Sequence, residues 1–261
     1  MTTRMTGYTG TDGTLPRLCI KNEVTASTIS TSTSATDHAA VAVVGPQTYT
    51  SWSPTALPAW VQALFVLSSE AQIDYVSARI SDGNGCAFKP QYWTGAAWVD
   101  LGTAVTVAAG SAETLLWLFD VKSTDRVRLY VTGSTAPFVA NLKAGIATVM
   151  PIGLQPGYAP SSLNPTDEYA NTISEGGQIL GSALKRSTAI EQLQFQPLSP
   201  AWVRANWPTI RDLLRTEAVV FAWRPSAYPD EVIYGMVTGK PAATYVSHVR
   251  MSVSLTIEGP S

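Results

Sequence analysis

The sequence is poor in charge, and this shortage excludes a class of partner. Only 14% of its 261 residues are charged, and the formal net charge is −2. The charged residues occur singly, so the broad positive potential by which proteins bind nucleic acid or an anionic membrane is missing. We expect neither as a partner.

Cysteine and histidine are almost absent as well. Cys19 and Cys86 are too few and too far apart for a zinc cluster or a dense disulfide framework. A disulfide between the two stays a possibility. Two reduced thiols in the core are favoured, because free cysteine is among the most buried residue types. The two histidines, His38 and His248, are also far apart in the sequence. We therefore expect no metal and no cofactor.

Catalytic motifs are missing too. The chain has no Gly-x-Ser-x-Gly, no phosphate-binding Gly-x-x-x-x-Gly-Lys and no Gly-x-Gly-x-x-Gly. The pair Asp37-His38 has the residue types of a metal-site fragment, but such a pair in a loop is more often a solvated turn. A glycosidase with paired carboxylates stays open, since two carboxylates need only meet in space. The sequence otherwise predicts no enzyme.

No segment looks like a membrane anchor or a secretion signal. Residues 1–14 are polar and glycine-rich, and no later run approaches the ~18 apolar residues of a membrane span. We expect a soluble protein without a secretory signal.

Short β-rich runs separated by turn residues fill the first half, for example residues 59–67 and 73–80. The sequence Asp82-Gly83-Asn84-Gly85 supplies residues that tolerate positive φ, as a hairpin turn requires. Trp93 and Trp98 flank a second turn, which places them side by side across a ladder. This spacing predicts an antiparallel sandwich or barrel.

Three segments of this half resemble the opening of a galactose-binding-like (discoidin-type) jelly roll. They are Ser-Ala-Thr-Asp-His at 34–38, Thr-Tyr-Thr-Ser-Trp-Ser-Pro at 48–54 and Trp-Val-Gln-Ala-Leu-Phe at 60–65. Residues 92–101, from Tyr92-Trp93 to Asp100-Leu101, are similar to a later hairpin of that family. The resemblance covers about residues 18–150 and implies a jelly-roll domain at 1–150. The terminal disulfide pair of extracellular members has no counterpart here, which argues against secretion.

A different second half follows. Its first part, residues 151–165, contains Pro151, Pro156, Pro160 and Pro165, which predict an extended connector because proline resists regular pairing. Residues 166–185 are polar and glycine-spotted, as in an arm that becomes ordered against a neighbour.

Regular elements are predicted beyond the arm. We expect a strand at 188–196, helix starts near Pro200 and Pro208, and a hairpin at 218–238. A long final strand should place six apolar residues on one face: Tyr245, Val249, Met251, Val253, Leu255 and Ile257.

The order of these elements resembles tail and baseplate proteins of long-tailed bacteriophages. The residues that carry it are Ile-Glu-Gln-Leu-Gln-Phe at 190–195, the helix, Val-Ile-Tyr-Gly-Met-Val at 232–237, and the final strand. The shared block of that family is a β sandwich or split barrel with a flanking helix, which would form the third segment, 166–261. With the jelly roll, the chain is similar to a distal tail (baseplate hub) protein.

That resemblance implies a structural virion protein of the tail tip or baseplate, assembled in the host cytoplasm. It would form a cyclic homo-oligomer, or ring, that joins the tail tube to receptor-binding parts, with tube, hub and tail-fibre proteins as partners. The implied fold class is mainly β, with an N-terminal antiparallel jelly roll, a second β domain and one or two short helices.

Aromatic residues beside the loops support an alternative, a carbohydrate-binding module that recognises a host surface glycan. A flat ring can stack on a sugar face while a nearby Asp binds its hydroxyls, and Asp37, Trp52 and Trp93 are the candidate residues. Tyr49, Tyr92 and Trp98 also lie on or beside predicted loops. Against this, tryptophan is buried on average, so Trp52, Trp60, Trp98 and Trp117 also fit core positions of the jelly roll.

Overall fold

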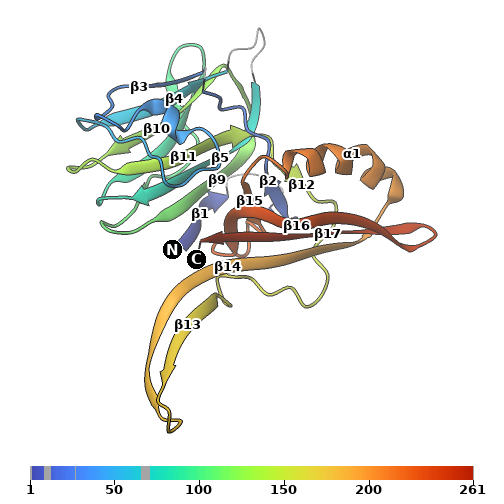
Figure 1. Cartoon of the computed structure of the whole chain (residues 1–261). Helices are drawn as coiled ribbons and strands as arrows, with labels where there is room; N and C mark the ends of the chain where they lie inside the picture. The colour runs from blue at the N-terminus through green and yellow to red at the C-terminus, as the bar shows by residue number, and fades with distance from the viewer. Residues whose placement is uncertain (1, 9–12, 27, 66–70, 261) are drawn as a thin grey trace.

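The computed structural model describes residues 2–8, 13–26, 28–65 and 71–260. Strands dominate it, and the helices in these ranges are α1 (Pro200–Leu213) and the short 3-10 helix η1 (Ala40–Val43) (Figure 1). The expected class, mainly β with antiparallel sheets, is confirmed. Within the same ranges, no helix is both long enough and apolar enough to span a membrane.

Two sheets packed face to face form a sandwich. The first has the order β1 (Thr2–Tyr8), β9 (Glu113–Thr124), β5 (Ala71–Asp82), β11 (Phe138–Gly145). The second has the order β3 (Ile29–Thr31), β4 (Ala59–Leu64), β10 (Arg126–Thr132), β6 (Ala87–Trp93), β7 (Trp98–Asp100), and β8 (Val105–Thr106) pairs with β6. Neighbouring strands are antiparallel except β1 and β9, which are parallel.

Alternating side chains build this sandwich. In β10, Val127, Leu129 and Val131 are buried, and the residues between them face outward. The predicted turn joins β5 to β6, with Asn84 at φ 49° and Gly85 at φ 74°. Trp93 and Trp98 pair as predicted. The predicted strand 59–67 appears as β4, and its residues 66 and 67 lie outside the described ranges.

A seven-stranded sheet forms the second part. Its order is β12 (Thr148–Val149), β2 (Arg17–Cys19), β15 (Val219–Ala222), β16 (Val232–Ser247), β17 (Arg250–Pro260), β14 (Ile179–Leu198), β13 (Thr166–Ile173). Helix α1 packs on it through Val203, Trp207 and Ile210, whose spacing gives one apolar face. The helix runs through Pro208, so one helix replaces the two starts that its prolines suggested.

The sheets do not divide at residue 150, where the sequence suggested a domain boundary. Strand β2 pairs with β15 and β12 pairs with β2, so both belong to the second part although they precede the connector. All strands of the sandwich except β1 are therefore inserted between β2 and β12 of the other sheet. Strands of two or three residues are too short to show a period, which is why their pairing was not visible in the sequence.

Buried charges fix the sandwich to the second sheet. Arg17 Nη1 lies 3.2 Å from Asp74 Oδ2, and the two side chains are only 8% and 7% exposed. Burial raises the pKa of Asp74, against the hydrogen bond from Ala147 N and the charge of Arg17. Lys143, 1% exposed, donates to the carbonyls of Ile20 and Ala218 and pairs with Glu217 at 3.3 Å. The parts thus share a buried polar interface as well as the connector.

The connector lies along β14. Gln155 N donates to Gln194 O at 2.9 Å, and Leu154 forms a bridge with Phe195. The buried carboxylate of Glu191 accepts hydrogen bonds from Tyr158 Oη at 2.8 Å and from Ser161 N and Oγ at 3.0 and 2.7 Å. The connector is therefore extended over the surface of the second sheet, as its prolines indicated.

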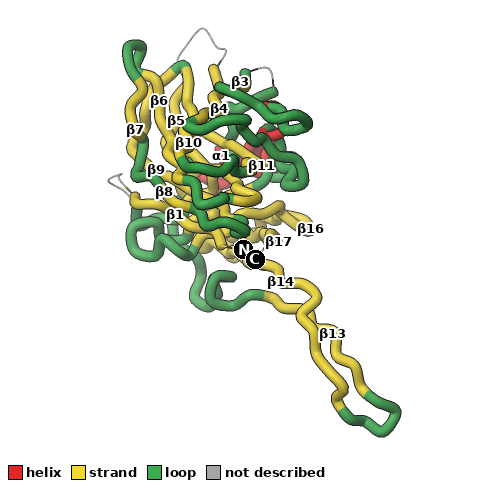
Figure 2. The backbone as a smooth tube through the Cα atoms, turned by 90° about the vertical axis from the view of Figure 1, so that its left-hand side faces the viewer, coloured by secondary structure: helices red, strands yellow, loops and turns green. Residues whose placement is uncertain are grey.

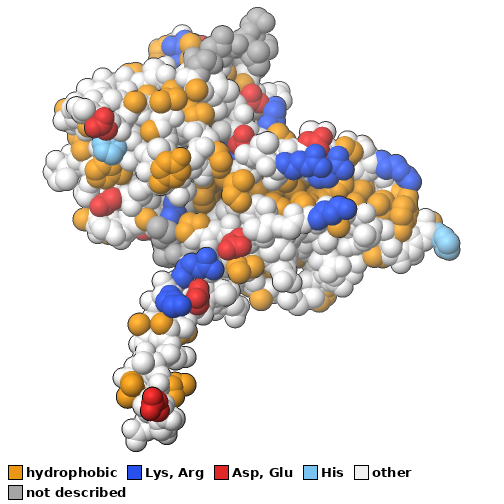
Figure 3. All heavy atoms as spheres, viewed as in Figure 1, with side chains coloured by type: hydrophobic (Ala, Val, Ile, Leu, Met, Phe, Trp, Pro, Cys, Tyr) orange, Lys and Arg blue, Asp and Glu red, His pale blue; other side chains and the backbone are white. Residues whose placement is uncertain are grey.

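The expected arm is a β hairpin that projects from the body (Figures 1 and 2). It consists of β13 and the first half of β14, and nearly all of residues 166–186 are exposed. Apolar side chains are nonetheless present on it (Figure 3). The exposed large ones are Tyr169, Ile173, Ile179, Leu180 and Leu184. A segment of this kind contributes little to the core of its own chain.

The closing strand is shorter than its periodicity suggested. Met251, Val253, Leu255 and Ile257 are buried as expected. Tyr245 and Val249 are exposed: Tyr245 belongs to β16, which ends at Ser247, and Val249 lies in the tight turn before β17. Alternating apolar residues continued through this turn, so the sequence pattern joined two strands into one.

Candidate functional site

The segment between β3 and β4 crosses one end of the sandwich and is held by backbone hydrogen bonds. Trp52 and Val139 exchange two such bonds, at 2.7 and 2.9 Å, and Ala35 N donates to Ser53 O at 2.8 Å. Val43 of η1 is fully buried beneath it. This loop is therefore a fixed surface on a rigid sheet, the usual setting of binding residues.

A hollow of about 470 Å³ opens in this loop, and we call it the Asp37–Tyr49 hollow. Its polar lining comes from Asp37, His38, Gln47, Thr50 and Ser51. Tyr49 adds an aromatic ring at the rim, and 86% of this residue is exposed. Asp37 adopts φ 66°, a left-handed conformation that Asp tolerates better than most residues.

His38 is oriented by its neighbours. Its Nδ1 lies 3.0 Å from Ser51 O, and its ring contacts Phe138 edge-on with a centroid distance of 5.0 Å. A carbonyl oxygen can only accept, so we assign the proton of the neutral ring to Nδ1. Nε2 is then the acceptor of this ring, and it can receive a hydrogen bond from a ligand hydroxyl.

The hollow thus combines a carboxylate, an imidazole acceptor and an amide with an exposed aromatic ring. A few fixed polar groups beside an apolar surface are typical of small-ligand sites. Among the described residues, no group of three His, Cys, Asp or Glu side chains is placed to hold a metal ion.

Trp52 does not belong to this hollow, which corrects the expected site. It is fully buried, and its Nε1 donates to Thr33 O at 2.9 Å. A ring without an exposed face cannot stack on a ligand. Trp52 is a core residue that anchors the loop, the alternative that the sequence left open.

Trp93 lies at the other end of the sandwich. It adjoins Trp98 and Thr124, near the start of β10. Asp37 instead lies in the loop whose His38 and Trp52 contact Phe138 and Val139, beyond the end of β10. Of Asp37, Trp52 and Trp93, only Asp37 lines the hollow. The sequence could not show which loops share an end, because that depends on the pairing of distant strands.

The other residues of the hollow carry weaker sequence signals than Asp37. Tyr49 was one aromatic among several beside loops, His38 was interpreted as part of a solvated turn, and Gln47 carried no signal. Proximity to Asp37 within one loop was the available clue. That clue did not separate Tyr49 from Trp52, because hydroxyl residues flank both rings in the sequence.

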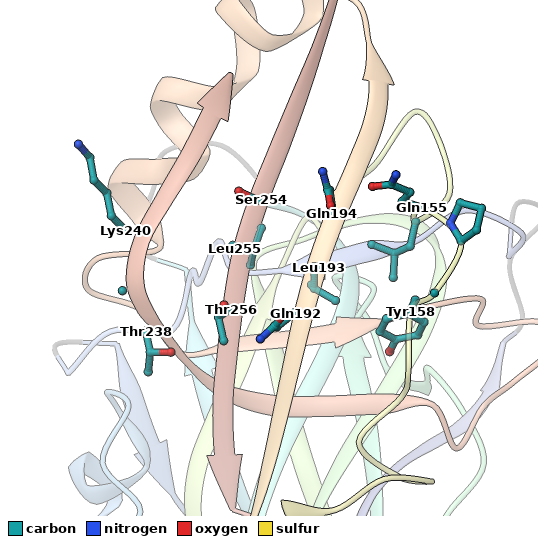
Figure 4. Close-up of a pocket in the computed structure, with 14 residues that line it drawn as sticks. Gln155, Tyr158, Gln192, Leu193, Gln194, Thr238, Lys240, Ser254, Leu255 and Thr256 are labelled. Atoms are coloured by element: carbon teal, nitrogen blue, oxygen red, sulfur yellow. The ribbon is translucent and has the colours of Figure 1, made fainter. Parts of the chain in front are cut away.

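A second hollow, of about 370 Å³, lies on the seven-stranded sheet (Figure 4). Gln192 and Gln194 of β14 adjoin Ser254 and Thr256 of β17, and the connector forms one wall. Its aromatic residue, Tyr158, already donates to Glu191 and contacts Trp223. This hollow offers amides, hydroxyls and the ammonium group of Lys240 but no ring as exposed as that of Tyr49, so the Asp37–Tyr49 hollow is the better candidate binding site.

No protein-family model matches this sequence, and no curated protein matches it. Solved structures are similar to about half of the chain. A Ruminococcus gnavus GH29 fucosidase in complex with fucose aligns over 49% of this chain at 15% identity and a TM-score of 0.39. The alignment covers only 27% of the fucosidase chain.

Two carbohydrate-binding modules of Clostridium perfringens are also similar. The family 32 module of NanJ, in complex with galactose, aligns over 50% of this chain and 98% of its own, at 11% identity and a TM-score of 0.40. The module CpGH89CBM32-5, in complex with GalNAc-β-1,3-galactose, aligns over 45% and 93%, at 13% identity and a TM-score of 0.37. These sugars are ligands of those proteins, and the site described above rests on the residues of this chain.

Proposed function

We propose that this chain is a carbohydrate-binding protein and that a sugar occupies the Asp37–Tyr49 hollow. One observation carries the proposal: the exposed ring of Tyr49 stands at the rim of a hollow that also contains Asp37, His38 and Gln47. The surrounding loop is held by the sheet, so a ligand need not order it. On this proposal the chain acts by binding, without catalysis.

The chemistry of a pyranose fits these groups. One face of the sugar carries C–H groups, which pack on the flat ring of Tyr49, and the phenol can remain in water. Two neighbouring hydroxyls can donate to the carboxylate of Asp37, and a third can donate to Nε2 of His38. Hydrogen bonds to a charged acceptor contribute more than neutral ones, so Asp37 should contribute most of the polar affinity.

Binding to a glycan array, followed by calorimetry with the best glycan, tests this proposal. Tyr49→Ala removes the stacking face, and Asp37→Asn removes the charge in a residue that also tolerates positive φ. Each should weaken binding by about tenfold or more, the equivalent of roughly 1.4 kcal/mol. Tyr228→Ala is the matched control, since Tyr228 is an exposed tyrosine in the segment between β15 and β16, away from the hollow. Equal binding by all four proteins would contradict the proposal.

A second candidate function is self-assembly into a structural ring, as in the phage tail proteins that the sequence resembles. The projecting β13–β14 hairpin favours it, because both edges of the hairpin carry backbone groups available for pairing and its apolar side chains lack a core. On this proposal the chain is located in a virion tail tip and contacts tube, hub and fibre proteins. Light scattering of the purified chain at several concentrations tests it, and a monomer throughout would reject it.

A further inference from the structure

The outer face of the six-stranded sheet carries a row of aromatic and cationic side chains. Arg126, Arg128 and Tyr130 alternate outward along β10. Trp60 of β4 pairs with Tyr130, Gln91 of β6 pairs with Arg128, and Trp93 pairs with Trp98 of β7. All of these except the buried Gln91 are partly exposed. We call this surface the Arg128 face.

Arg128 is held in place between two rings. Its guanidinium carbon lies 4.2 Å from the ring centroid of Trp98 and 5.3 Å from that of Tyr130. Its Nε donates to Gln91 Oε1 at 2.8 Å, and Gln91 in turn donates to Asp100 Oδ1 at 2.6 Å. Three contacts therefore fix the plane of this guanidinium, which lowers the entropy that a ligand must remove.

The neighbouring charges form direct ion pairs, whereas Arg128 is linked to the carboxylate of Asp100 only through Gln91. Lys89 forms an ion pair with Asp100 at 2.8 Å, and Arg126 forms one with Asp125 at 2.7 Å. Within the described ranges, no carboxylate lies within salt-bridge distance of Arg128. Its two terminal nitrogens present the fork that binds a carboxylate with two parallel hydrogen bonds.

Aromatic rings flank this guanidinium along the strands. Trp93, with Arg126 at 5.4 Å from its centroid, marks one end of the row, and Trp60 and Tyr130 mark the other. Arg126 and Tyr130 are four residues apart, roughly 13 Å along a strand at about 3.3 Å per residue. An extended chain with flat repeating units can therefore contact both ends at once.

We propose that the Arg128 face binds an extended anionic polysaccharide, with a uronate carboxylate on Arg128 and neighbouring sugar rings on the tryptophans. A uronic acid provides one carboxylate per sugar together with the C–H face that stacks on an aromatic ring. A single-stranded nucleic acid also stacks, but its affinity depends on neutralising several phosphates. Of the three cations on this face, Lys89 and Arg126 already form ion pairs with carboxylates. The face therefore suits a polymer that needs only one arginine for its carboxylate.

This surface is separate from the Asp37–Tyr49 hollow and does not depend on the function proposed for it. The hollow lies in the loop between β3 and β4 at one end of the sandwich, whereas the Arg128 face lies on the outer face of the second sheet and extends to the opposite end at Trp93. Variants of each site should leave the other unaffected, so failure of one proposal can be told from failure of the other.

The test is binding of the full chain to polygalacturonate, with dextran and single-stranded polyuridylate as comparisons. We expect binding to polygalacturonate that weakens with added salt and little binding to the other two. Arg128→Gln should lower the affinity by about tenfold or more, the usual consequence of losing a charge-assisted pair. Arg211→Gln, a change of the same charge on the exposed surface of α1, is the matched control.

Two further variants separate binding from folding. Arg128→Lys keeps the charge but loses the planar fork, so it should recover only part of the affinity. Trp98→Ala should weaken binding, with the melting temperature measured in parallel. Tyr49→Ala should bind polygalacturonate normally. No binding to polygalacturonate, stronger binding to polyuridylate, or equal affinity of Arg128→Gln and Arg211→Gln would each overturn the proposal.

Discussion

Replacing Trp52 by Ala should destabilise the whole sandwich and should not act as a binding mutation. Trp52 is fully buried in the core cluster, where truncation of a large aromatic costs about 3 to 5 kcal/mol. The change also removes the hydrogen bond that Trp52 Nε1 donates to Thr33 O. Its loss adds about 1 kcal/mol to the destabilisation unless a water molecule replaces the donor. The total, roughly 4 to 6 kcal/mol, approaches the stability of an ordinary domain.

Urea unfolding monitored by circular dichroism measures this cost, with Trp52→Phe as the comparison. Phenylalanine keeps most of the packing but lacks the donor, so its cost should be about 1 to 3 kcal/mol. Tyr49→Ala, at an exposed position, should leave the unfolding midpoint nearly unchanged. A Trp52→Ala protein with wild-type stability and lost sugar binding would refute the assignment of Trp52 to the core.

Three other outcomes follow from the structure. Replacing residues 168–186 by an Asn-Gly turn joins the paired residues Asp167 and Ser187. This variant should not self-associate, and its melting temperature should stay within a few degrees of the wild type; a variant that still assembles would show that the arm does not carry the contact between copies. Limited proteolysis should cut first at the tip of the arm, residues 174–178, and not in the connector, whose backbone is bonded to β14; early release of a fragment ending near residue 155 would contradict this. Burial raises the pKa of Cys19 and Tyr75 above their ordinary values of 9.0 and 10.0. The folded state therefore keeps protons that the unfolded state loses, so the free energy of unfolding should fall as pH rises above about 9, and less steeply in Cys19→Ala. A free energy of unfolding that stays constant to pH 10 would contradict this.

Local features of the fold were visible in the sequence. The turn at Asn84 and Gly85, the pair Trp93 and Trp98, and the apolar face from Met251 to Ile257 all depend on neighbours a few residues apart. Turn chemistry and a period of two are sufficient for such features.

Features that depend on distant pairing were not visible. Strand β2 joins a sheet whose other strands lie more than a hundred residues away, and three residues give no period. The buried carboxylate of Glu191 sits among apolar residues of β14, and only the hydroxyls of the connector explain it. The same limit applies to the site, because sequence could nominate Asp37 but could not place Trp93 at the opposite end of the sandwich.

The central claim is that the Asp37–Tyr49 hollow binds a sugar. The most direct measurement is a heteronuclear NMR titration of the intact chain with the best glycan from an array. We predict that the largest shifts fall on residues 37–51, and that they disappear in Tyr49→Ala while its spectrum remains that of a folded protein. Shifts centred elsewhere, or unchanged binding by Tyr49→Ala, would contradict the claim.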